Sequence, residues 1–245
     1  TVELTAFNWR LRPLRLKASR TLVQSRFRIS VGPPKTHDVV LITLSLKNMI
    51  MGGLTSRFSQ NGRQPDRHTP RFVARVAYGL KRLYNATPER LRYNFLLERA
   101  KMAYFSNFTP SSKMAMHQSF PVMNLNLFTL APHFYPHLAV IDGLEAMEGN
   151  GPVDGERVEW RMALASADWL AADVTVARLM GFELEEIGYL YYCAQAGYGT
   201  SDPTAIQVVG NVRLAKVARR FKRSASAHLQ RCWESPAVSR CVQAA

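Results

Sequence analysis

The stretch PKTHDVVLITLSLKN, residues 34–48, guides the interpretation of the whole chain. Its middle, residues 39–46, is apolar and rich in β-branched side chains, which predicts a buried strand or a strand that enters a helix. A shorter strand is expected just before it, over residues 27–31, where Gly32-Pro33-Pro34 ends the apolar pattern. In open α/β sheets, ligand-binding groups gather in the loops at strand ends. The polar residues on either side of the apolar run are therefore the first candidates for a functional site.

Two polar groups flank this run, Lys35-Thr36-His37 before it and Lys47-Asn48 after it. Lysine supplies a positive charge, threonine a hydroxyl group, and histidine a ring that transfers protons near neutral pH. A lysine at the end of an apolar strand is costly to bury unless it is solvated or paired. The alternative, two exposed lysines and a loop histidine, fits the spacing equally well.

A second polar stretch follows a predicted strand over residues 138–141. We expect a Gly-rich acidic loop from Asp142 to Gly155, because its glycines allow close backbone approach. Asp142, Glu148 and Asn150 offer hard oxygen ligands for a divalent cation, or partners for Lys35 and Lys47. The spacing does not match an EF-hand loop. A turn-rich loop with self-bonded carboxylates remains the alternative.

Two aspartates belong to a helix predicted from residue 166 or 168 to Gly181, where a left-handed C-terminal residue is expected. Asp168 lies where a helix-capping acid is expected. Asp173 lies deeper, between alanines and a valine, and a carboxylate there needs a partner or a cavity. Asp173 is therefore the stronger candidate of the two.

The remaining pattern alternates helices with short strands, which favours a single α/β domain with a central, mixed sheet flanked by helices. Further helices are expected over residues 72–83, 87–104 and 184–196, and a strand over residues 206–209. Residues 105–136 are expected to be rich in loops, since Pro132 and Pro136 argue against a helix; they contain the polar candidates His117 and Asn124. We expect a basic N-terminal remnant over residues 1–25, the α/β domain over residues 26–212, and a basic C-terminal tail over residues 213–245.

The net charge of +14 is spread unevenly. The first 100 residues hold 19 Lys and Arg against 5 acidic residues, the next 100 hold 5 against 11, and the last 45 hold 8 against 2. Such basic ends fit nucleic acid, an anionic membrane surface, an acidic substrate, or simply a well-solvated surface. The chain begins at Thr1, without Met and without a signal-peptide pattern, so we expect a fragment that lacks an N-terminal piece.

Several common classes of site find no support in the sequence. The three cysteines contain no C-x-x-C pair, so no iron–sulfur cluster is expected from them, and their low number favours a reducing, cytoplasmic location. Phosphate-loop, dinucleotide-binding and G-x-S-x-G motifs are absent, and no apolar run reaches the length of a membrane span.

Taken together, the ordered motifs resemble the family called domain of unknown function 362, over about residues 25–215. The matching motifs are Pro34-Lys35-Thr36-His37, Thr43-Leu44-Ser45-Leu46-Lys47-Asn48, Asp142-Gly143, Met147-Glu148-Gly149-Asn150-Gly151-Pro152 with Gly155, Ala165-Ser166-Ala167-Asp168 with Asp173 and Met180-Gly181, and Ile187-Gly188-Tyr189. The resemblance implies an uncharacterised protein, some of whose relatives carry a ferredoxin-like iron–sulfur segment with cysteines that this chain lacks. It also implies a domain that extends further upstream than this chain does.

We therefore expect an enzyme or redox component, of oxidoreductase type, that acts on a small anionic ligand at one Lys/His/Asp/Glu pocket. The catalytic candidates are His37, Lys35, Asp142 and Asp173, and the ligand-binding candidates are Thr36, Lys47, Asn48, His117, Asn124, Glu148 and Asn150. The metal or cofactor, if one is bound, stays open. The alternative is a protein that binds nucleic acid, or docks a ferredoxin-like redox partner, through its basic surface.

Overall fold

The central sheet forms where the sequence places its apolar runs. The computed structural model describes residues 1–55, 96–100, 102 and 111–243, so the helices predicted over residues 72–83 and 87–104 fall mostly outside it. The sheet consists of β3 (Ile29–Gly32), β4 (Lys35–His37), β5 (Leu41–Thr43), β6 (Leu138–Asn150) and β7 (Asp154–Ser166). Strand β6 pairs in parallel with β3 and β4 and antiparallel with β7, while β5 pairs antiparallel with β4. The predicted mixed sheet is confirmed.

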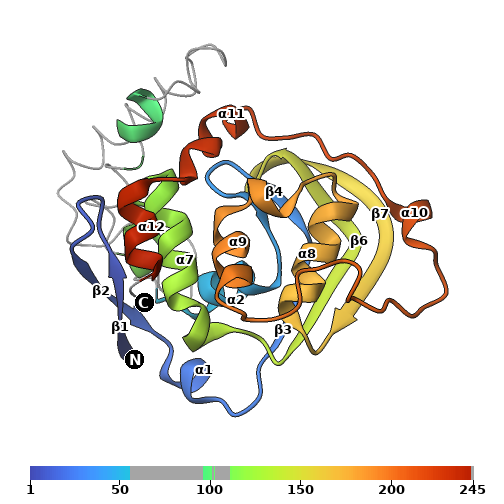
Figure 1. The fold of residues 1–245 in the computed structure, drawn as a ribbon, viewed down its shortest axis with the longest axis horizontal. Coiled ribbons are helices and arrows are strands. Elements are labelled where there is room, and N and C mark those ends of the chain that lie inside the picture. The colour runs from blue at the N-terminus through green and yellow to red at the C-terminus, as the bar shows by residue number, and fades with distance from the viewer. Residues whose placement is uncertain (56–95, 101, 103–110, 244–245) are drawn as a thin grey trace, which may run out of the picture.

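Helices cover one face of this sheet in two layers (Figure 1). Helices α2 (Ser45–Gly53) and α8 (Trp169–Leu179) pack directly on the strands. Beyond them lie α7 (Phe120–Phe134), α9 (Gly188–Gln195) and α12 (Pro236–Gln243). A separate antiparallel pair, β1 (Val2–Phe7) and β2 (Pro13–Ala18), packs on α7, so that the weakly patterned N-terminal residues are ordered. The described residues form a single α/β domain.

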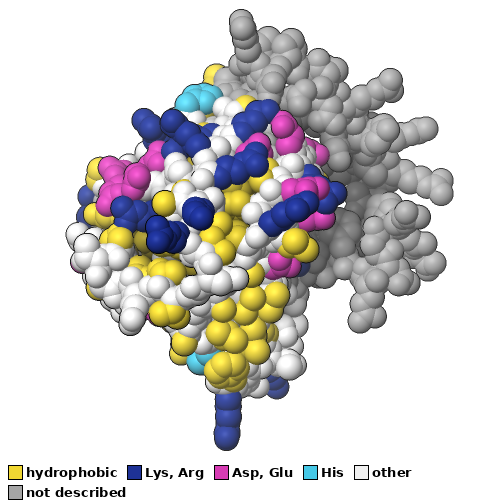
Figure 2. Space-filling model, turned by 90° about the vertical axis from the view of Figure 1, so that its right-hand side faces the viewer, with side chains coloured by type: hydrophobic (Ala, Val, Ile, Leu, Met, Phe, Trp, Pro, Cys, Tyr) yellow, Lys and Arg dark blue, Asp and Glu magenta, His cyan; other side chains and the backbone are white. Residues whose placement is uncertain are grey.

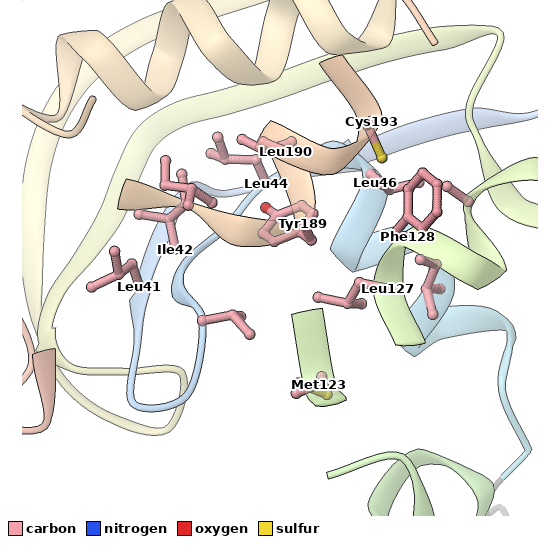
Figure 3. Packing of buried hydrophobic residues seen from close by; sticks show 14 of the residues in the cluster. Leu41, Ile42, Leu44, Leu46, Met123, Leu127, Phe128, Tyr189, Leu190 and Cys193 are labelled. Atoms are coloured by element: carbon pink, nitrogen blue, oxygen red, sulfur yellow. The ribbon is translucent and has the colours of Figure 1, made fainter. Parts of the chain in front are cut away.

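The hydrophobic core lies between these layers. Figure 3 shows Leu44 and Leu46 beside Tyr189 of α9 and Phe128 of α7, all of them buried. Short elements complete the chain: α1 (Arg20–Gln24), α6 (Ser112–Ala115), η1 (Leu184–Glu186), α10 (Leu214–Val217), α11 (Ala227–Gln230) and η2 (Arg231–Trp233). From α9 the chain passes below α8, runs outside β7 to α10 and returns over the sheet to α11 (Figure 1).

The Gly-rich acidic loop predicted from Asp142 to Gly155 was wrong. These residues instead belong to a hairpin of two 13-residue strands, β6 and β7, joined by a short turn after Asn150. The glycines serve the pairing itself: a Cβ on Gly143 would lie 2.7 Å from the Met162 sulfur, and one on Gly155 would lie 2.4 Å from the Met147 side chain. Glycine at these positions leaves room for the methionine side chains of the neighbouring strand, and does not mark a loop.

The prediction that residues 105–136 are rich in loops was wrong for residues 120–134, which form α7. Ser119 caps this helix by accepting a hydrogen bond from the Val122 N–H, Pro121 lies in its first turn, and Pro132 lies inside its last turns. Proline is tolerated at a helix start, whereas Pro132 costs a hydrogen bond. Most of the helix is buried, and this tertiary packing outweighs the local penalty.

Other boundaries agree with the sequence. Helix α8 ends before Gly181, which has the expected positive φ of 81°, and Asp168 caps its N-terminus. Residues 39–46 contain the short strand β5 followed directly by α2, so the second of the two predicted alternatives is the one observed. The strand predicted over residues 206–209 is absent from the structure, because these residues run outside β7 without pairing with it.

Candidate functional site

The hairpin of β4 and β5 gathers three polar side chains on one face. Lys35 lies opposite Thr43, and His37 lies opposite Leu41. Residues directly opposite in an antiparallel pair point to the same side, and so do residues two apart in a strand. Lys35, His37 and Thr43 therefore share a face. Thr43 is buried, and its hydroxyl has no hydrogen-bond partner in the structure.

Lys47 joins this face from the first turn of α2. Its side chain is only 2% exposed, and its ammonium group forms no ion pair with any described residue. Burial lowers the pKa of Lys47 to about 7; the Asp38 carboxylate raises this pKa, and the Lys35 ammonium lowers it further. The effect of these two charges places Lys47 near Lys35 and Asp38 of the β4–β5 hairpin. Asp38 is thus a nearby negative charge, but it forms no direct ion pair with Lys47, and a buried ammonium without such a pair is costly.

Two histidine rings stack on each other at the β4–β5 hairpin. The rings of His37 and His117 are stacked, with centroids 6.5 Å apart. The His37 Nδ1 atom accepts a hydrogen bond from the Val39 N–H at 2.9 Å and lies 3.2 Å from the Asp38 carboxylate. The His117 Nδ1–H donates to the Lys113 carbonyl at 2.7 Å. The group consisting of Lys35, His37, Thr43, Lys47 and His117 is called the Lys47 site below.

Asp173 of α8 contacts the first residues of the same helix, α2. Its two carboxylate oxygens accept hydrogen bonds from the Ser45 N–H (2.9 Å) and the Leu46 N–H (3.1 Å). Leu44, the residue before α2, offers no side-chain cap, so Asp173 of α8 supplies one from a distant part of the chain. Burial raises the pKa of Asp173 to about 6, against the opposing effect of these hydrogen bonds. Asp173 thus holds the helix that carries Lys47.

Three predicted ligand-binding residues have partners that tie segments together. The Thr36 hydroxyl donates to the Gly149 carbonyl at 2.8 Å. The Glu148 carboxylate accepts from the Lys222 N–H at 3.1 Å and lies 3.5 Å from the Arg219 guanidinium. The Asn150 amide oxygen accepts from the Ala225 N–H at 2.9 Å. These contacts bind β4 to β6 and bind the C-terminal segment to the β6–β7 turn.

Two further candidates are also engaged elsewhere. Asn124 lies inside α7, where its side chain accepts from the Tyr189 N–H and donates to the Phe120 carbonyl. Asn48 lies against β3, where a Cβ on Gly32 would come within 2.8 Å of its amide nitrogen. A larger residue at position 32 would therefore force the Asn48 side chain to move.

Asp142 lies apart from the Lys47 site. It is exposed on β6, and its carboxylate accepts from the Leu144 N–H. It borders a cavity of about 570 Å³ between β7, α8 and residues 206–217, and neither Lys35, His37 nor Lys47 is among the described residues that line this cavity. The expected convergence of Asp142 with the lysines and His37 in one pocket is thus not seen here.

The sequence reasoning passed over several residues that the structure brings to the site. Thr43 belongs to one of the family-like motifs but was not predicted as a site residue, and Asp38 follows His37 directly. Gln230 and Ser226 contact the backbone of the β4–β5 hairpin from 193 and 188 positions away. Their only local signal was a place in a basic tail, which gives no hint of this contact.

Three further features concern the surface charge, metal binding and membrane spanning. On the face of the molecule that carries β7, Lys and Arg side chains are interspersed with Asp and Glu (Figure 2), and pairs such as Arg157–Glu145 and Arg161–Glu159 are in contact. Groups of three or more His, Cys, Asp or Glu placed to hold a metal are not found among the described residues. No helix in the described part of the chain has the length and apolar character needed to cross a bilayer.

Comparison with family models matched residues 8–178 to a family described as "Domain of unknown function (DUF362)". The match includes β4, β5, α2, both long strands and nearly all of α8, but ends before α9 and the C-terminal segment. Comparison with curated proteins gave no significant match, and comparison with solved structures gave none either.

Proposed function

The chain belongs to the DUF362 family, and on that premise we propose that it binds a small anionic ligand at the Lys47 site and exchanges a proton with it. The ligand class is a carboxylate, sulfate or phosphate group on a small molecule. The proposal keeps Lys35, Lys47 and His37 as the central groups. Asp173 acts as a support for α2, and Asp142 has no part in it.

The observation that carries the proposal is the buried, unpaired ammonium group of Lys47. A buried charge is normally retained only when a partner compensates for its lost hydration. Lys35 is a second cation close enough to lower the pKa of Lys47, so an anion between them would relieve two unfavourable interactions at once. The unpartnered Thr43 hydroxyl is a further donor for the same anion.

Proton transfer follows from the chemistry of two groups. A lysine with a pKa of about 7 exists in both protonation states near neutral pH, as a general acid or base requires. In the neutral His37 ring, Nδ1 accepts the Val39 N–H, so the ring proton resides on Nε2. His37 Nε2 is therefore the donating position of that ring.

The test measures sulfate and acetate binding by isothermal titration calorimetry, because the charge of each anion is constant between pH 6 and pH 8.5. We expect tighter binding at pH 6, where Lys47 is protonated, than at pH 8.5. Lys47→Met should weaken binding by about 10-fold or more and reduce its pH dependence, since a charge-assisted contact is worth about 1.5–3 kcal/mol.

The matched control is Lys216→Met, which removes the same charge from an exposed position of α10. Its anion affinity should remain within about twofold of the parent protein. Equal binding by the parent protein and Lys47→Met, or equal losses in both lysine variants, would contradict the assignment of the anion to Lys47.

A further inference from the structure

The side chain of Gln230 connects the two ends of the turn that carries His37. Gln230 is the last residue of α11 and is 1% exposed. Its amide nitrogen donates to the His37 carbonyl at 3.0 Å, and its amide oxygen accepts from the Leu41 N–H. One buried amide group thus spans the β4–β5 turn from His37 to Leu41.

The turn needs such a partner because of the conformation of Leu41. Its φ of 61° lies in the left-handed region, which is unfavourable for a leucine. Strained backbone of this kind persists when the surrounding structure holds it. By taking up the Leu41 N–H, Gln230 stabilises the turn in the form that places His37 opposite Leu41.

Ser226 extends the same contact. Its hydroxyl donates to the Asp38 carbonyl at 2.7 Å and accepts from the Gln230 amide nitrogen at 3.0 Å. Further along, the Gly149 N–H donates to the Lys222 carbonyl, and Asn150 receives the Ala225 N–H. The segment 222–230 therefore binds both the β4–β5 turn and the β6–β7 turn, and it lies outside the part of the chain that the family model matches.

We propose that Gln230 is a positioning residue for His37, by which the C-terminal segment completes the Lys47 site. The inference rests on the proposed anion-binding function and adds to it the residue that fixes the histidine. Gln230 itself contacts the backbone of the hairpin at His37 and Leu41, so its effect on a ligand passes through His37. Ser226 assists by orienting the Gln230 amide group.

The experiment compares Gln230→Met, which keeps the length of the side chain but loses its polar contacts, with Gln230→Glu, which keeps the acceptor for the Leu41 N–H. The readouts are sulfate affinity by calorimetry and the position of the His37 ring signal in a proton–carbon NMR spectrum. We expect Gln230→Met to weaken sulfate binding about fivefold or more and to shift the His37 signal, with a smaller change in Gln230→Glu.

The matched control is Arg28→Met. Arg28 is also buried and also donates to backbone carbonyls, those of Tyr135, Val23 and Ser25, near α1 at the opposite end of the molecule from α11 (Figure 1). Arg28→Met should lower the melting temperature at least as much as Gln230→Met, while its sulfate affinity and His37 signal stay unchanged.

The two readouts separate the two proposals. If the parent protein does not bind sulfate but Gln230→Met alone shifts the His37 signal, the positioning role stands and the anion-binding function fails. If the parent protein binds sulfate and Gln230→Met changes neither readout, the positioning role is overturned. Equal changes in Gln230→Met and Arg28→Met would also overturn it, because they would reflect a general loss of stability.

Discussion

Residues 35–48 and residues 142–155 are two polar stretches that meet along the same sheet, yet their polar atoms are satisfied very differently. In the second stretch, Glu148 and Asn150 form hydrogen bonds to the C-terminal segment. In the first, among the described residues, the buried Lys47 ammonium has no direct ion pair and the buried Thr43 hydroxyl has no hydrogen-bond partner. Buried polar groups are nearly always paired, so these two exceptions are the groups at which we propose that the ligand binds. On this proposal, the residues of the second stretch hold the fold together and those of the first bind the ligand.

The same contrast, between a buried charge with hydrogen-bond partners and one without, is found at the first turn of α2. Asp173 is a buried charge whose two oxygens both accept backbone hydrogen bonds. Lys47, one residue beyond Leu46, is a buried charge without such partners. If Asp173 is scaffold and Lys47 is site, removing them should change stability in opposite directions.

The largest expected effect is that of Asp173→Ala. This change leaves the Ser45 and Leu46 N–H groups buried without an acceptor, and it removes the cap of α2. We expect a loss of about 2–4 kcal/mol in the free energy of unfolding, measured by urea denaturation at pH 7. A loss below about 0.5 kcal/mol, the range typical of neutral surface substitutions, would show that α2 does not depend on this carboxylate.

The free energy of unfolding of Asp173→Asn, measured as a function of pH, tests the same carboxylate in a second way. The folded pKa of Asp173, about 6, lies above the ordinary value of 3.8, so the folded state binds more protons than the unfolded state between these pH values. The contribution of Asp173 to stability therefore falls as pH rises from about 4 to about 6. Tyr189 and Cys193 lie nearby, but burial raises the pKa of both, so they do not titrate in this window. The free energy of unfolding of the parent protein minus that of Asp173→Asn should therefore fall between pH 4 and pH 6.

Lys47→Met should have a smaller effect of the opposite sign. Replacing the unpaired buried ammonium with an apolar side chain should raise the free energy of unfolding at pH 6 by about 1–3 kcal/mol. The folded pKa of Lys47, about 7, lies below the ordinary 10.5, so the unfolded chain binds the extra proton between these values, and stability rises with pH there. The variant should lack this rise. Destabilisation at pH 6 would instead indicate that Lys47 is a structural residue.

The sequence predicted the parts of the fold that depend on local patterns. The apolar run at residues 39–46, the Asp168 cap and the left-handed Gly181 were all readable from residue type and spacing. Helix α7 was missed because Pro132 argues locally against a helix that tertiary burial stabilises.

The β6–β7 hairpin and the Gln230 contact were missed for a different reason. The glycines of the hairpin are explained by methionines on the neighbouring strand, and Gln230 meets His37 across 193 positions. For the site, residue chemistry pointed to Lys35, His37 and Lys47. Which polar residues already have partners depends on long-range contacts that a single sequence does not display.

The smallest expected effect is that of Asn150→Ala, which tests whether residues 142–155 have a structural role. Asn150→Ala leaves the Ala225 N–H without its acceptor and loosens the segment that carries Gln230, so we expect a loss of about 1–2 kcal/mol in the free energy of unfolding. Asp142→Asn is the matched control from the same hairpin: it is exposed and bonds only the nearby Leu144 N–H, so its effect should stay within about 0.5 kcal/mol. Because Asn150 contacts the C-terminal segment at Ala225 and not at Gln230, its variant should also weaken sulfate binding less than Gln230→Met does. If Asp142→Asn weakens sulfate binding more than Asn150→Ala does, residues 142–155 would contribute to the anion site. The distinction between the two regions would then fail.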